Sequence, residues 1–102
     1  RVPTPNVSCV DLELLTEKVA TADQINSVIK EASEGPLKGI LGYDELSLVS
    51  IDFNHASESS TFAPQQTKVL PSGMTRILSW YDNEWGFSNR MADTAVAMGK
   101  LI

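Results

Sequence analysis

The chain has 102 residues, and its 13 acidic and 8 basic side chains give a formal net charge of -5. This length is typical of one domain, so we expect a single domain over residues 1–102. The acidic charge disfavours nucleic acid and anionic membranes as partners, because the field of the protein repels polyanions. No apolar run approaches the roughly 18 residues of a membrane-spanning helix. The only cysteine, Cys9, cannot form an internal disulfide, which favours a reducing, cytoplasmic location.

The chain begins at Arg1 instead of a methionine and continues into a segment with two prolines. With one cysteine and one histidine, the chain has few of the side chains that commonly act in catalysis. We therefore expect these residues to be a piece of a longer protein.

The first third of the chain predicts a strand followed by a helix. Apolar and acidic side chains alternate, which predicts a strand over Val7–Val19. Thr21-Ala22-Asp23-Gln24 has the pattern of a capping box, and apolar residues follow at i, i+3, i+4 and i+7. These features predict a helix over Ala22–Glu34. Gly35 and Pro36 should end it, with the glycine in the left-handed conformation.

The remainder predicts several strands and a final helix. Apolar and β-branched runs predict strands at Leu48–Phe53, Ser59–Phe62, Thr67–Leu70 and Met74–Tyr81, and a stripe of helical spacing predicts a helix over Trp85–Ile102. A Pro-Ser-Gly turn lets the last two strands pair as a hairpin. This order indicates an α+β fold, with a mostly antiparallel sheet and helices on one face.

The sequence contains no pattern typical of a metal or phosphate site. Cys9 and His55 are 46 positions apart (55 minus 9), and no paired ligand spacing is present. The six glycines form neither a dinucleotide-binding nor a Lys-terminated phosphate loop. If the protein uses a nicotinamide cofactor, the main binding domain must therefore lie elsewhere.

Two side chains could act as chemical groups on their own. Cys9 lies in the middle of a predicted strand with no cation or helix start beside it, so we expect a buried, inert thiol and not a nucleophile. His55 follows a predicted strand and could act as an acid–base group. A histidine that braces a loop fits the same position, because no sequence partner fixes its role.

The segment Trp80–Arg90 gathers two tryptophans, a tyrosine and a phenylalanine within eight residues, in a chain with seven aromatic residues. Asp82, Asn83 and Glu84 lie at its strand-to-helix corner, where an amide could point into a cleft. In the alternative interpretation the aromatic side chains are core and Asp82 or Asn83 only caps the helix.

Two long strings, Arg1–Ser8 and Trp80–Arg90, resemble the glyceraldehyde-3-phosphate dehydrogenase family of phosphorylated-aldehyde dehydrogenases. The resemblance covers essentially all 102 residues but only the last third of a family member. Within the family, Leu48–His55, Gln66–Val69 and Asn89–Thr94 look closer to the D-erythrose-4-phosphate dehydrogenase branch. The glycolytic branch is the alternative.

The resemblance implies roles for two residues. Arg1 matches an arginine that binds a phosphate group, for which a planar guanidinium is well suited. Asn83 matches the asparagine that hydrogen-bonds the nicotinamide carboxamide of NAD. Phe87 stands where many relatives have tyrosine, and Phe62-Ala63-Pro64 departs from the family pattern. Cys9 does not match the catalytic cysteine, which should lie upstream with its partner histidine.

The implied reaction belongs to the longer protein, and the chain alone should be inactive. An upstream thiolate attacks the aldehyde, hydride passes to NAD and a thioester forms. Water resolves the thioester in the erythrose branch, giving 4-phosphoerythronate for pyridoxal phosphate (pyridoxine) biosynthesis, whereas inorganic phosphate does so in the glycolytic branch. The resemblance also implies a homotetramer built across the sheets. A non-catalytic oligomerisation module is the alternative from another class.

Overall fold

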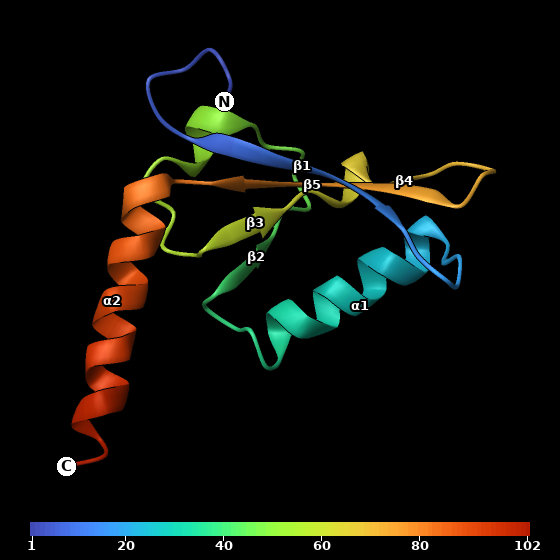
Figure 1. The fold of residues 1–102 in the computed structure, drawn as a ribbon. Coiled ribbons are helices and arrows are strands. Elements are labelled where there is room, and N and C mark those ends of the chain that lie inside the picture. The colour runs from blue at the N-terminus through green and yellow to red at the C-terminus, as the bar shows by residue number, and fades with distance from the viewer.

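Five strands and two helices make up the computed structural model, which describes residues 1–102 (Figure 1). The strands are β1 (Ser8–Leu15), β2 (Leu41–Tyr43), β3 (Ser60–Phe62), β4 (Lys68–Val69) and β5 (Met74–Tyr81), and the helices are α1 (Ala22–Glu34) and α2 (Asn83–Gly99). Two short 3-10 turns, η1 (Ser50–Phe53) and η2 (Pro64–Gln66), lie in the connections.

The strands form one sheet in the order β1-β5-β3-β2, with β4 also paired to β5. β1 and β5 run antiparallel over their whole lengths, from Ser8 opposite Tyr81 to Leu15 opposite Met74. β3 and β4 are also antiparallel to β5, and only β2 and β3 are parallel. The predicted α+β fold with a mostly antiparallel sheet is confirmed.

β1 is shorter than the predicted strand Val7–Val19. Val7 has a φ of 74°, which no strand accommodates, so pairing begins at Ser8. β1 ends at Leu15 because its partner β5 begins opposite it. Beyond that point the Thr16 hydroxyl donates to the Lys18 carbonyl at 2.7 Å and closes a turn.

The prediction for α1 is confirmed at both ends. The Gln24 N–H donates to the Thr21 hydroxyl at 3.2 Å, and the Thr21 N–H donates to the Gln24 side chain at 2.9 Å, which completes the capping box. The left-handed conformation predicted for Gly35 is wrong, because its φ and ψ are -112° and -111°. In the connection that follows α1, the glycine with a left-handed conformation is Gly39, with a φ of 77°.

The strand predicted over Leu48–Phe53 is wrong. The carboxylate of Asp44 accepts hydrogen bonds from the N–H groups of Leu46 and Leu48 at 2.8 and 2.7 Å, and Asp52 accepts from the N–H of Val49 at 2.9 Å. These side chains take the donors that a strand would offer to its neighbour, and the chain turns into η1. The sequence also did not predict β2, whose three residues are too short for a recognisable period.

The end of the chain follows the prediction closely. β5 has the predicted bounds, and the Leu70 N–H donates to the Met74 carbonyl at 2.8 Å in the predicted hairpin. Gly73, with a φ of 87°, allows the tight turn. α2 begins at Asn83, two residues before the predicted start, because Asp82 caps it.

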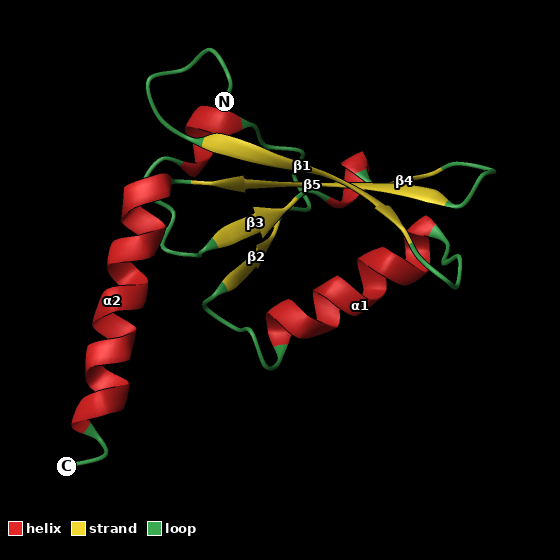
Figure 2. Ribbon diagram, in the orientation of Figure 1, coloured by secondary structure: helices red, strands yellow, loops and turns green.

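The two helices relate differently to the sheet (Figure 2). α1 lies alongside the sheet, whereas α2 begins at the end of β5 and extends away from it. The buried apolar core is small and gathers at the sheet and its connections: Val7, Phe53, Phe62, Ala63 and Leu78. Neither helix combines the length and apolar character needed to cross a membrane.

Candidate functional site

The carboxylate of Asp82 joins three segments at the end of β5. Asp82 is only 3% exposed, and its Oδ1 caps α2 by accepting from the Trp85 N–H at 3.2 Å. Its Oδ2 accepts from the His55 N–H at 2.9 Å and from the Asn6 amide at 2.8 Å. The Asn6 amide also donates to the Asn54 side chain at 2.8 Å. One buried acid therefore holds the N-terminal segment, the loop after η1 and the start of α2 together.

These contacts determine the charge of Asp82. Burial opposes ionisation, but hydrogen bonds from the His55 and Trp85 N–H groups and from the Asn6 amide outweigh it and hold the pKa of Asp82 below its ordinary value. Asp82 is therefore ionised at neutral pH.

Arg1 lies beside the beginning of β1. Its guanidinium donates to the Ser8 hydroxyl at 3.3 Å, and Ser8 is buried opposite Tyr81. The three ion pairs of the structure join Lys30 to Glu45, Arg76 to Asp11 and Arg90 to Asp93, so no carboxylate neutralises Arg1. The exposed guanidinium keeps most of its N–H donors free.

Asn83 is the first residue of α2 and is half-buried. Its side-chain amide takes part in none of the chain's side-chain hydrogen bonds, unlike that of Asn6, which donates to two acceptors. The pairing of Ser8 with Tyr81 brings Arg1 and Asn83 to the same end of the sheet, although no hydrogen bond joins their side chains.

His55 and Cys9 occupy structural positions. The His55 ring stacks on the Trp85 ring, with centroids 4.5 Å apart and planes 26° from parallel. Together with its N–H bond to Asp82, this contact matches the loop-bracing interpretation of His55. Cys9 is a free thiol opposite Trp80 in the sheet, and it is half-buried where burial was predicted.

Four non-glycine residues have positive φ angles: Val7 (74°) follows Asn6, His55 (64°) contacts Asp82, and Ser47 (58°) and Ser50 (35°) lie before and at the start of η1. Such conformations cost on the order of 1–3 kcal/mol each, and they persist where the surroundings fix them, often at binding sites. Here the Thr4 and Ser50 hydroxyls share a hydrogen bond of 2.9 Å, and Asp82 holds His55. Two of the four residues, Val7 and His55, lie next to or in contact with the side chains that bond to Asp82 or with Asp82 itself.

The sequence interpretation included Asp82 as a helix cap but not as this junction, and it gave Asn6 and Asn54 no role. These asparagines contact partners 48 and 76 positions away, so no local pattern reveals them. No group of three or more His, Cys, Asp or Glu side chains in the structure could hold a metal ion.

Comparison with known proteins agrees with this fold. Residues 1–83 match the family model described as glyceraldehyde 3-phosphate dehydrogenase, C-terminal domain. The chain belongs to this family. It is 60% identical over 102 residues to glyceraldehyde-3-phosphate dehydrogenase of Cereibacter sphaeroides, and 58% identical over 101 residues to that of Xanthobacter flavus. The enzyme of that name from Zymomonas mobilis is 50% identical over 103 residues.

These alignments cover 99% to 100% of this chain but only 30% to 31% of the relatives. The chain thus spans just under a third of the length of the curated relatives it matches. The family resemblance inferred from the sequence is confirmed. The closer resemblance to the erythrose-4-phosphate branch gains no support, because these relatives are named glyceraldehyde-3-phosphate dehydrogenase.

Proposed function

We propose that this chain is the C-terminal part of an NAD-dependent dehydrogenase that oxidises a phosphorylated aldehyde. The observation that supports this proposal is the pair of uncommitted polar groups at one end of the sheet. Arg1 presents a guanidinium without a carboxylate partner, and Asn83 presents an amide without a hydrogen-bond partner. Both flank the Asp82 junction in a chain of this family.

In this proposal Arg1 binds the phosphate of the substrate. A guanidinium offers two parallel, charge-assisted hydrogen bonds to a phosphate, which an ammonium group does not. The Ser8 hydroxyl accepts only one N–H of Arg1 and so orients the group without neutralising it. The net charge of -5 does not prevent this role, because one placed cation acts at short range.

Asn83 is suited to orient the nicotinamide ring. Its amide can donate to and accept from the carboxamide of the cofactor, and it stands at the start of α2, which Asp82 caps. NAD, when bound, would accept the hydride. We place the nucleophilic cysteine and its partner histidine in the remainder of the protein, because Cys9 is half-buried within β1.

Two substrates fit this class. The names of relatives at 50% to 60% identity favour glyceraldehyde 3-phosphate, with inorganic phosphate resolving the thioester. The short strings described above favour D-erythrose 4-phosphate, with water resolving it. The deciding experiment measures initial rates of NADH formation by the natural protein that contains this chain, with each aldehyde and with or without inorganic phosphate. Strict dependence on phosphate supports the first substrate, and phosphate-independent oxidation of erythrose 4-phosphate supports the second.

A non-catalytic, self-associating module is the second candidate. The observation that favours it is the exposure of Val10 and Leu12 on β1, at 45% and 40%, on a sheet face that a second copy could cover. Absence of NADH formation with either aldehyde, together with a concentration-dependent oligomer, would select this candidate.

The role of Asn83 gives a direct prediction for the natural protein. Asn83→Ala should lower kcat/KM for NAD about tenfold, because the loss of a hydrogen bond that orients the reacting ring costs about 1.4 kcal/mol. Steady-state kinetics with varied NAD provides the measurement. Asn89→Ala is the matched control, since its amide donates only to the Trp85 carbonyl within the same helix. Equal kinetics of the two variants would contradict the role of Asn83.

A further inference from the structure

The attachment of α2 to the rest of the molecule is confined to its first two turns. Gly86 is its only buried residue, and every residue after Arg90 is exposed. Figure 1 shows α2 extending away from the sheet toward the C-terminus. Within this chain, the orientation of the helix start, where Asn83 lies, therefore depends on the Asp82 cap, the stacking of Trp85 on His55 and two further contacts.

The first contact is a close approach of backbone to backbone. A Cβ atom added to Gly86 would lie 2.8 Å from the Glu58 carbonyl oxygen and 3.5 Å from the Ser59 Cα. Only glycine allows this separation without displacing the helix. Gly86 thus fixes how closely α2 approaches the loop before β3.

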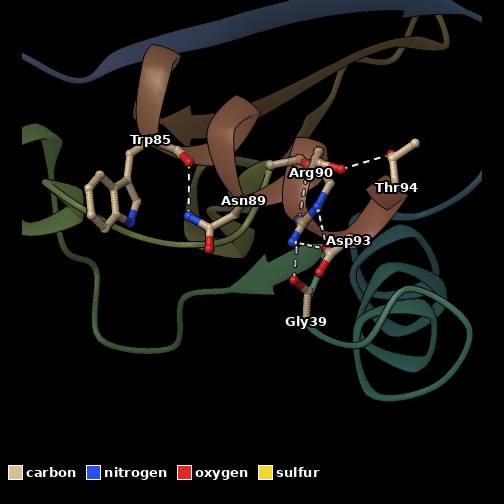
Figure 3. A network of polar contacts seen from close by, with 7 residues as sticks. Gly39, Trp85, Asn89, Arg90, Asp93 and Thr94 are labelled. Atoms are coloured by element: carbon tan, nitrogen blue, oxygen red, sulfur yellow. Dashed lines mark hydrogen bonds and ion pairs between the residues drawn. The ribbon is translucent and has the colours of Figure 1, made fainter. Parts of the chain in front are cut away.

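The second contact is the Arg90 side chain (Figure 3). Its Nη1 donates to the Gly39 carbonyl and to the Ser59 hydroxyl, each at 3.3 Å. Its Nε donates to the Asp93 carboxylate at 2.9 Å, and its Nη2 lies 2.6 Å from the same carboxylate. Gly39 comes just before β2 and Ser59 just before β3, so one side chain, 25% exposed, joins the helix to the starts of both strands.

The spacing of these residues connects Arg90 to the proposed cofactor contact. Asn83, Gly86 and Arg90 stand at i, i+3 and i+7, which places them on one face of a helix. Arg90 lies about 10 Å along the axis from Asn83 at 1.5 Å per residue. A side chain that holds this face two turns from Asn83 restrains both the rotation of α2 about its axis and its tilt about Gly86, in addition to the Trp85 and Asp82 contacts at the helix start.

We propose that Arg90 is a positioning residue for the dehydrogenase reaction: by holding α2 to Gly39 and Ser59, it sets where the Asn83 amide meets the nicotinamide. This inference rests on the proposed role of Asn83. The planar guanidinium can reach the strand starts and Asp93 at once, which a lysine ammonium cannot do with the same geometry.

The test compares Arg90→Met with the parent in the natural protein that contains this chain. Methionine keeps an unbranched stem and removes every donor. We expect KM for NAD to rise about tenfold, because the group that orients the nicotinamide is displaced. The value of kcat should change less, and KM for the aldehyde should stay unchanged. In an Asn83→Ala background the same substitution should change KM for NAD less than twofold, since Arg90 acts through Asn83.

Two variants separate positioning from general stabilisation. Arg76→Met removes another arginine that bonds a carboxylate, Asp11, but contacts β1 and not α2, so KM for NAD should stay unchanged. Ser59→Ala removes one acceptor of Arg90 without altering the helix, and it should raise KM for NAD two- to threefold. If Arg90→Met does not fold, the comparison of KM for NAD between Ser59→Ala and the parent tests the proposal.

Three results would contradict the proposal. An unchanged KM for NAD in Arg90→Met and Ser59→Ala, together with a raised KM in Asn83→Ala, overturns the positioning role and leaves the proposed function standing. An equal effect of Arg90→Met with and without Asn83 also overturns it, because Arg90 then acts by another route. No effect of Asn83→Ala overturns both the cofactor contact and the inference built on it.

Discussion

Replacing Asp82 with alanine should destabilise the protein by about 3 kcal/mol, because the substitution leaves three donors without their acceptor. The Asn6 amide and the N–H groups of His55 and Trp85 all bond to this carboxylate, which is only 3% exposed. Urea unfolding monitored by circular dichroism provides the measurement. Asp93→Ala is the matched control: Asp93 is an exposed acid on the same helix, and its loss should change stability by about 0.5 kcal/mol or less.

The same group should make stability depend on pH in one direction. Because the folded protein holds the pKa of Asp82 below its ordinary value of about 3.9, the stabilisation is fully present above that pH. It is lost as the pH falls through the lowered folded value. Asp82→Asn keeps the shape of the side chain but not the charge, so its stability should fall less steeply below about pH 4. Identical acid unfolding curves for the parent and Asp82→Asn would contradict this account.

The second large effect concerns Arg1 in the natural protein. Arg1→Ala should raise KM for the phosphorylated aldehyde by about 10- to 100-fold, which corresponds to the loss of one or two charge-assisted hydrogen bonds. KM for an unphosphorylated aldehyde of the same length should be unchanged, since it has no group for Arg1 to bind. Steady-state kinetics with both aldehydes gives the ratio.

The lysine substitution sharpens the interpretation of Arg1. Arg1→Lys keeps the positive charge but loses the planar fork, so its KM for the phosphorylated aldehyde should lie between those of the parent and Arg1→Ala. If Arg1→Ala affects both aldehydes equally, the guanidinium does not bind phosphate. Its bond to Ser8 would then be its structural role.

The elements that the sequence predicted well are those whose signals are local. The capping box of Thr21 and Gln24 lies within four residues, and it set the start of α1 correctly. The bounds of β5 were also predicted correctly. At Leu48–Phe53 the same apolar pattern was misleading, because the Asp44 and Asp52 carboxylates accept the backbone donors. The strand propensity of a segment does not show whether its backbone N–H groups will bond to a neighbouring strand or to a nearby side chain.

The candidate site was predictable only in part. Arg1 and Asn83 came from the resemblance of two terminal strings; Arg1 has no carboxylate partner and Asn83 has no side-chain hydrogen bond, which is compatible with the roles proposed for them. The Asp82 junction depends on Asn6, 76 positions away in the chain, and on the His55 backbone. The contact with Asn6 follows from the pairing of β1 with β5, and the contact with His55 joins the loop after η1 to the end of β5, so local sequence spacing does not predict either one.

That pairing of the first strand with the last has a consequence for how the protein is made. Ser8 pairs with Tyr81, so β1 leaves the ribosome long before its partner exists and must wait with its apolar residues unpaired. Contacts between residues so distant in sequence form slowly. The entropy cost of closing the long loop must be met before the hydrogen bonds between the strands can stabilise it. Among the five strands of this sheet, β1 is therefore made first but can pair with β5 only after the other strands have been made. The site beside it is complete only after α2 has begun to emerge.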